Sequence, residues 1–127
     1  RRADTTGMVQ EYPMPQQRYG FGVSWDALPG RPKVDIDLQC VVVDSTGTIV
    51  DCAYYNNLKA ARGGVTHSGD EATGAADGID ECVWVTLSKL PDNISVLVFV
   101  IAAYAGGKLA DVANGMIHVL EDSKANE

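Results

Sequence analysis

Acidic side chains are concentrated in one part of this sequence. The 127-residue chain has seventeen Asp and Glu residues against ten Lys and Arg, which gives a formal charge of −7. Nine of the carboxylates fall between residues 35 and 81, against two basic residues: Asp35, Asp37, Asp44, Asp51, Asp70, Glu71, Asp77, Asp80 and Glu81. Carboxylates at this density repel one another unless something positive joins them. The same charge argues against nucleic-acid binding, which needs a footprint of Lys and Arg.

Two groups of these carboxylates have the spacing of a calcium site. Asp35 and Asp37 are two apart in a strand pattern, so both side chains point to one face. The second group lies in residues 70–81, where Gly74 and Gly78 permit tight turns that bring several oxygens together. Calcium takes about six to eight oxygen ligands on flexible loops, and the EF-hand pattern is absent. Each group also has a plainer interpretation, as a solvated strand face and as an ordinary acidic loop.

The other polar residues give weaker signals for chemistry. His67 stands alone in a polar loop, which is more typical of a structural residue than of a catalytic base or a ligand. No serine has a Gly-x-Ser-x-Gly context, and no phosphate loop or dinucleotide fingerprint is present. Trp25 and Trp84 are expected to anchor the core, since no basic groove accompanies them. We therefore expect no enzyme and keep a hydrolase only as a third interpretation.

The carboxylates must be positioned by strands, because the rest of the sequence carries strand signals. Alternating or continuous apolar runs separated by turns predict six strands, at residues 19–25, 34–43, 48–55, 82–87, 95–103 and 115–120. The strand at 95–103 is expected to be central in its sheet, and 108–112 forms at most a helical turn. Residues 56–80 lack a hydrophobic period and are expected to be a long loop, which at this length is usually functional or disordered. The predicted fold is all-β, a two-sheet β-sandwich.

The expected organisation is one domain with two short flanking segments. Residues 1–18 are an extended arm, 19–122 the sandwich domain and 123–127 a polar tail. The longest apolar run, 94–105, is too short for a transmembrane helix. The chain starts without Met, so either a targeting segment was removed or this is part of a longer chain. The compartment stays unknown: we expect a soluble protein, cytoplasmic or in an organelle after such a removal.

The three cysteines, Cys40, Cys52 and Cys82, lack Cys-x-x-Cys spacing and are expected to be small buried residues in strands. The segment 44–47 predicts a hairpin with Gly47 in the left-handed conformation. That turn places Cys40 directly opposite Cys52 on the neighbouring strand, near the distance of a disulfide. We expect free thiols, because nothing indicates an oxidising compartment.

Five short motifs in order resemble the TerD family of bacterial stress proteins. They are Gly22-Val-Ser-Trp-Asp26, Val34-Asp-Ile-Asp-Leu38, Tyr54-Tyr-Asn-Asn-Leu-Lys59, Gly64-Val-Thr-His-Ser-Gly-Asp70 with Thr73-Gly74, and Asp77-Gly-Ile-Asp-Glu81. The resemblance covers residues 22–122. It implies a two-sheet sandwich with calcium (Ca2+) bound between loops at one end. It also implies a role in resistance to tellurite, phage and other stresses, with no established catalytic reaction.

The resemblance also implies a ligand set. Carried over by motif, the metal ligands are Asp35, Asp37, Asn56 or Asn57, Asp70, Asp77, Asp80 and Glu81, with Asp26 as a weaker candidate. This chain has Ala75, Ala76 and Ile79 where family members usually carry acidic residues or glycine. One of the family's two calcium sites is therefore expected to be weakened or lost.

Two functions follow as hypotheses. The first is a calcium-binding, non-catalytic module with a stress-response or scaffolding role. The second is a structural accessory subunit, which keeps the fold with weakened metal binding inside a larger assembly. The family domain normally continues past Leu120 with further strands, so we expect this chain to need a protein partner. The run 96–101 would be left as a bare edge, and it has no Lys or Pro to guard it.

Overall fold

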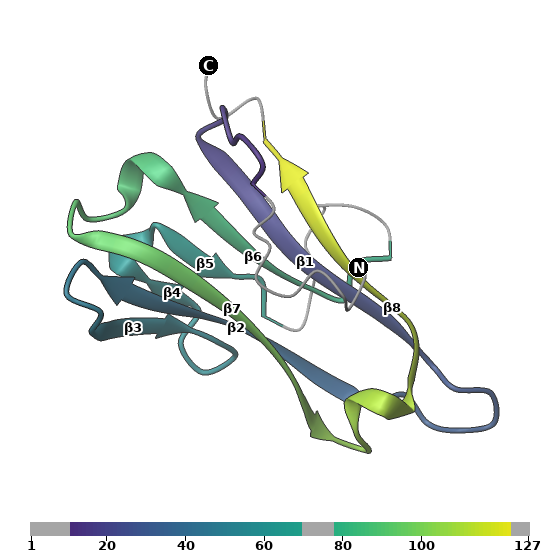
Figure 1. The fold of residues 1–127 in the computed structure, drawn as a ribbon. Coiled ribbons are helices and arrows are strands. Elements are labelled where there is room, and N and C mark those ends of the chain that lie inside the picture. The colour runs from purple at the N-terminus through teal and green to yellow at the C-terminus, as the bar shows by residue number, and fades with distance from the viewer. Residues whose placement is uncertain (1–10, 70–77, 123–127) are drawn as a thin grey trace.

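The computed structural model describes residues 11–69 and 78–122, which form two antiparallel sheets packed face to face (Figure 1). The five-stranded sheet contains, in spatial order, β4 (Lys59–Ala60), β5 (Val65–His67), β6 (Glu81–Thr86), β1 (Arg18–Ala27) and β8 (Val112–Glu121). The three-stranded sheet contains β3 (Ile49–Ala53), β2 (Asp35–Asp44) and β7 (Ile94–Ala105). Three short 3-10 turns connect strands: η1 (Ala61–Gly63), η2 (Leu87–Lys89) and η3 (Leu109–Asp111). The predicted two-sheet β-sandwich is confirmed.

The core lies between the sheets and follows the alternation of the two long strands. In β2 the side chains of Ile36, Leu38, Cys40 and Val42 are buried, while the residues between them face outward. In β1 the alternate residues Val23 and Trp25 meet them from the other sheet. Burial of this many apolar side chains, at about 25 cal/mol per Å² removed from water, holds the layers together.

Trp25 is a core residue as predicted, but Trp84 is not. The indole of Trp25 is buried and donates from Nε1 to the carbonyl of Val34 at 2.6 Å. Trp84 is half-buried in β6, beside Gly20, with the Arg18 guanidinium 4.1 Å from its ring centroid. A Cβ at position 20 would stand 2.9 Å from the Trp84 ring, so Gly20 makes room for this side chain.

All six predicted strands are present, with ends within three residues of those expected. The turn expected at 108–112 is η3. Two predictions were wrong. The segment 56–80 contains β4, η1 and β5, which are too short to show a hydrophobic period. The strand expected to be central, β7, lies at the edge of its sheet, where β2 is its one partner among the described strands.

The predicted opposition of Cys40 and Cys52 was also wrong. Gly47 has φ +85° as expected for the hairpin, but Cys40 pairs with Ala53, and Cys52 lies opposite Val41. Val43 pairs with Ile49, but the next residue, Val42, pairs with Asp51. A β-bulge at this point therefore adds one residue to β3. A shift of one residue exchanges the faces of a strand. Cys52 is therefore half-buried and turned away from Cys40, whereas Cys40 and Cys82 are buried, and all three thiols are free.

Among the residues described, no helix is long and apolar enough to cross a membrane.

Candidate metal centre

Three carboxylates from the two sheets meet at one point. Asp35 and Asp37 are the first and third residues of β2, and Glu81 is the first residue of β6. One carboxylate oxygen of each lies within 4.8 Å of the other two. Asp35 is exposed, Asp37 is half-buried and Glu81 is only 8% exposed. This carboxylate cluster joins the start of β2 to the start of β6.

The cluster forms where β3 no longer covers β2. The pairing of β2 with β3 ends at Cys40, so the backbone of Leu38 has no β3 partner. Side chains from the other sheet take that place. The Leu38 N–H donates to Glu81 Oε1 at 3.3 Å, and the Leu38 carbonyl lies 2.9 Å from His67 Nε2. A buried backbone group without a partner is costly, so Glu81 and His67 stabilise this bare edge.

His67 and Glu81 are in direct contact. His67 Nε2 lies 3.1 Å from Glu81 Oε1, and the imidazole is almost fully buried. Its other nitrogen, Nδ1, accepts a hydrogen bond from the Gly69 N–H at 2.8 Å. Because Nδ1 accepts, the ring proton is on Nε2, where it faces two oxygens. Sequence reasoning assigned His67 a structural role and did not place it beside a predicted ligand.

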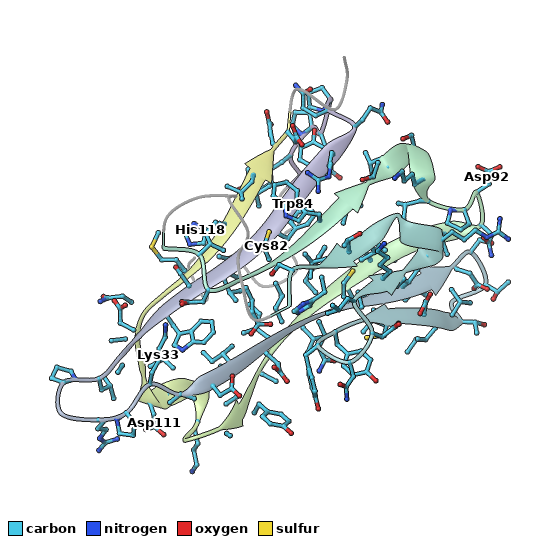
Figure 2. The ribbon with its side chains drawn as sticks, turned by 180° about the vertical axis from the view of Figure 1, so that it is seen from behind. Lys33, Cys82, Trp84, Asp92, Asp111 and His118 are labelled. Atoms are coloured by element: carbon cyan, nitrogen blue, oxygen red, sulfur yellow. The ribbon has the colours of Figure 1, made fainter. Side chains whose placement is uncertain are left out.

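Asp80 lies outside the carboxylate cluster, although it is the neighbour of Glu81. Its Oδ1 forms an ion pair with Lys33 Nζ at 2.7 Å, and its Oδ2 accepts from the Trp25 N–H at 2.9 Å. The Lys33 ammonium also lies 4.9 Å from the centroid of the Trp25 ring. A hollow of about 330 Å³ lies beside this ion pair. It is lined by Trp25, Lys33, Val34, Asp35, Asp80 and Glu81. Figure 2 shows Lys33 at the end of the molecule where β1 connects to β2.

The two asparagines lie in the turn that follows β3. Asn56 is exposed. The side-chain amide of Asn57 donates to the Cys52 carbonyl at 2.7 Å and to Asp51 Oδ1 at 3.4 Å, which ties this turn to β3. The weaker candidate Asp26 accepts a hydrogen bond from Asn114. The predicted ligands Asp70 and Asp77 lie outside the described residues.

An aromatic pair stands close to Asp37. The rings of Tyr55 and Tyr104 meet edge to face, with centroids 5.8 Å apart. The pKa of Tyr55 is raised above its ordinary value, first by its hydrogen bond to Tyr104 and its electrostatic interaction with that residue, then by burial and by the charge of Asp37. Both tyrosines are exposed. No sequence signal connected them with the carboxylates, because they come from the turn after β3 and from β7.

A serine and a histidine also meet on the five-stranded sheet. Ser24 Oγ lies 2.8 Å from His118 Nε2, a contact between the neighbouring strands β1 and β8. Ser24 lies within β1, beside a register shift between Ser24 and Asp26, and not in the strained strand-to-helix turn that holds the nucleophile of α/β-hydrolases. The pair is a hydrogen bond between neighbouring strands.

The donor set of the carboxylate cluster consists of oxygen atoms alone. Carboxylates suit hard cations such as calcium and magnesium, whereas zinc sites usually include nitrogen or sulfur ligands. Three carboxylates supply at most six oxygens, so the cluster fits an ion that accepts flexible, partly bidentate ligation.

Comparison with known proteins places these residues in a family. The TerD domain family model matches residues 10–127. The tellurium resistance protein TerZ of Serratia marcescens is 35% identical over 113 residues, covering 81% of this chain and 58% of the relative. General stress protein 16U of Bacillus subtilis is 32% identical over 115 residues, with 84% and 60% coverage. The chain thus spans about 60% of the length of these curated relatives.

Solved structures agree with the fold. The crystal structure of a TerD homologue from Streptomyces coelicolor superposes with a TM-score of 0.66 at 22% identity, covering 84% of this chain and 66% of that one. A second crystal structure, of a protein of unknown function, gives a TM-score of 0.69 at 18% identity, with 87% and 68% coverage.

Proposed function

The chain belongs to the TerD family, and we propose that it is a calcium-binding domain with a non-catalytic, scaffolding role in a stress response. One observation carries the calcium part: carboxylates from β2 and β6 converge to within 4.8 Å, and one of them, Glu81, is buried. A buried carboxylate beside two others is unfavourable unless a cation or hydrogen bonds compensate it.

Calcium fits this cluster better than other common ions. Asp35, Asp37 and Glu81 would hold it, and further oxygens would come from water, backbone carbonyls or the acidic loop of residues 70–81. Magnesium demands nearly ideal octahedral geometry and sheds water reluctantly, so an irregular set of carboxylates suits it poorly. Bound calcium supplies charge neutralisation and a link between the two sheets.

The stress-response part rests on the relatives. They are named as tellurium resistance and general stress proteins. Among the residues that the structure describes, the polar groups considered above include the carboxylates with their hydrogen-bond donors and the cross-strand Ser24–His118 pair. Such a domain acts by binding, and its calcium occupancy would control its rigidity.

Calorimetric titration of the chelator-treated protein with calcium tests the proposal. We expect binding heat and a rise in melting temperature at millimolar calcium, since an ion that binds only the folded state stabilises it. Magnesium should produce a much smaller rise. Absence of both heat and melting shift with calcium would contradict the proposal.

A specific observation favours the second hypothesis, the accessory subunit of a larger assembly. The edge strands β7 and β8 expose apolar side chains: Val96, Val98 and Val100 on one, and Met116, Ile117 and Val119 on the other. Between them a hollow of about 260 Å³ reaches core residues such as Ile36 and Ile101. Exposed apolar edges mark interaction sites, and β7 has no Lys or Pro to discourage pairing.

Native mass analysis of the protein extracted from its own source tests the second hypothesis. We expect a species larger than 13.5 kDa, the mass of one chain. A stable monomer without a bound partner would contradict it, whatever the outcome of the calcium titration.

A further inference from the structure

We propose that His67 is the residue that positions Glu81 as a calcium ligand, so that the affinity of the carboxylate cluster depends on the Nε2–H group of this imidazole. The inference rests on the proposed calcium site and adds a residue that does not itself touch the ion. His67 lies in β5, the neighbour of β6 in the five-stranded sheet, so the two side chains approach from adjacent strands.

The protonation pattern of the ring follows from its neighbours. The Gly69 N–H donates to Nδ1 at 2.8 Å, which requires a lone pair on that nitrogen. Nε2 faces the Leu38 carbonyl at 2.9 Å and Glu81 Oε1 at 3.1 Å. Two oxygens at these distances from one nitrogen repel it unless a proton lies between them. Nε2 is therefore a donor: its N–H is hydrogen-bonded to the Leu38 carbonyl of β2, and Glu81 Oε1 lies 3.1 Å from the same nitrogen.

This arrangement restricts the Glu81 side chain. Its Oε1 accepts a hydrogen bond from the Leu38 N–H and lies 3.1 Å from His67 Nε2, while one of its oxygens belongs to the cluster with Asp35 and Asp37. A free glutamate side chain has three rotatable bonds, and ordering it on binding costs conformational entropy. His67 removes part of that freedom before the ion arrives. Partners that hydrogen-bond a metal ligand typically contribute about 10- to 100-fold in affinity.

Two substitutions separate the roles of the two ring nitrogens. In His67→Gln the side-chain NH2 reaches the place of Nε2 and keeps a donor for Leu38 and Glu81. In His67→Asn the shorter amide reaches only the place of Nδ1, so it keeps the acceptor for Gly69 but loses the donor near Glu81. Both replace a buried ring by a smaller amide, so each is the control for the loss of packing in the other.

The experiment measures calcium affinity by calorimetry and calcium-free stability by urea denaturation in all three proteins. We expect His67→Asn to bind calcium about 10- to 100-fold more weakly and His67→Gln to stay within about threefold of the wild type. The two variants should lose comparable stability without calcium. If the role of His67 were purely structural, the two variants would then also lose comparable calcium affinity. Equal affinities in the three proteins would overturn the inference while leaving the proposed function intact. Failure of the wild type to bind calcium would overturn both.

A spectroscopic measurement on the wild type keeps the inference falsifiable if neither variant folds. Long-range nitrogen–proton spectra of the His67 ring should show the proton on Nε2. That nitrogen resonance should shift on addition of calcium, while the resonance of His118 stays in place. A proton on Nδ1, or an Nε2 resonance unmoved by saturating calcium, would overturn the inference.

Discussion

Substitution of Asp35 by Asn is expected to change stability in opposite directions with and without calcium. Asp35, Asp37 and Glu81 have carboxylate oxygens within 4.8 Å of one another. Two unit charges at this distance repel by about 0.9 kcal/mol in a medium as polar as water. Asp35 is exposed, so this lower limit is the appropriate one. Removing its charge abolishes two such repulsions, which amounts to about 2 kcal/mol at low salt.

Physiological salt reduces that figure, because the Debye length of about 8 Å is not much longer than the separation. We therefore expect Asp35→Asn to stabilise the calcium-free protein by about 1 kcal/mol at 0.15 M salt, a rise in Tm of roughly 3–5 °C. Calcium at one hundred times its Kd should stabilise the wild type by about 2.7 kcal/mol. The variant should lose most of that gain, since an amide oxygen carries no charge.

Thermal melts followed by circular dichroism, with chelator and with calcium, measure both effects. The matched control is Asp92→Asn, which removes an exposed carboxylate at the opposite end of the molecule from Lys33 (Figure 2). It should change neither melt by more than about 1 °C. The reasoning fails if Asp35→Asn leaves the calcium-free Tm unchanged at low salt. It also fails if the variant keeps the full calcium gain, because Asp35 would then lie on a solvated face.

Three further predictions concern Lys33 and the thiols. Lys33→Gln should tighten calcium binding about fivefold in calorimetry, because it removes a cation from the hollow and releases Asp80; unchanged affinity would exclude this competition. A thiol reagent at pH 8 should label Cys52 first, since burial raises the pKa of Cys40 to about 12 and of Cys82 to about 11; mass spectrometry of the labelled peptides checks the order. Because these two pKa values lie above the ordinary 9.0, the unfolded chain ionises first, and stability should fall as pH rises from about 9 towards 11. Urea denaturation at pH 8 and pH 10 measures that loss, and equal stability at the two values would contradict it.

Sequence reasoning succeeded where a pattern repeats along one strand. The alternation from Val34 to Val43 predicted β2, its buried face and the common face of Asp35 and Asp37. It failed where one residue changes the register, because the residue that the bulge adds to β3 is not distinguishable in sequence from its apolar neighbours. The short strands β4 and β5 were missed for a related reason: two or three residues are too few to define a period.

The candidate site shows the same division. The resemblance named both Asp80 and Glu81, but consecutive residues at the start of a strand point in different directions. Glu81 turns towards β2, and Asp80 turns towards Lys33 and the backbone of Trp25. The partner Lys33 is far from Asp80 in sequence, so no local pattern connects them. His67 was a lone polar residue in the sequence, and only the pairing of β5 with β6 brings it to Glu81.

The position of the carboxylate cluster connects the proposed calcium binding with the stability of the sandwich. Asp35 and Asp37 belong to one sheet, Glu81 to the other, and the Leu38 backbone between them is satisfied by side chains from the opposite sheet. Without a cation, the hydrogen bonds of the Leu38 backbone hold the two sheets together, and the repulsion between the three carboxylates opposes them at the same place. A bound cation removes the repulsion and keeps the hydrogen bonds. Calcium would therefore stabilise the contact between the two sheets. This stabilisation would be strongest at the part of β2 that has no backbone partner in β3.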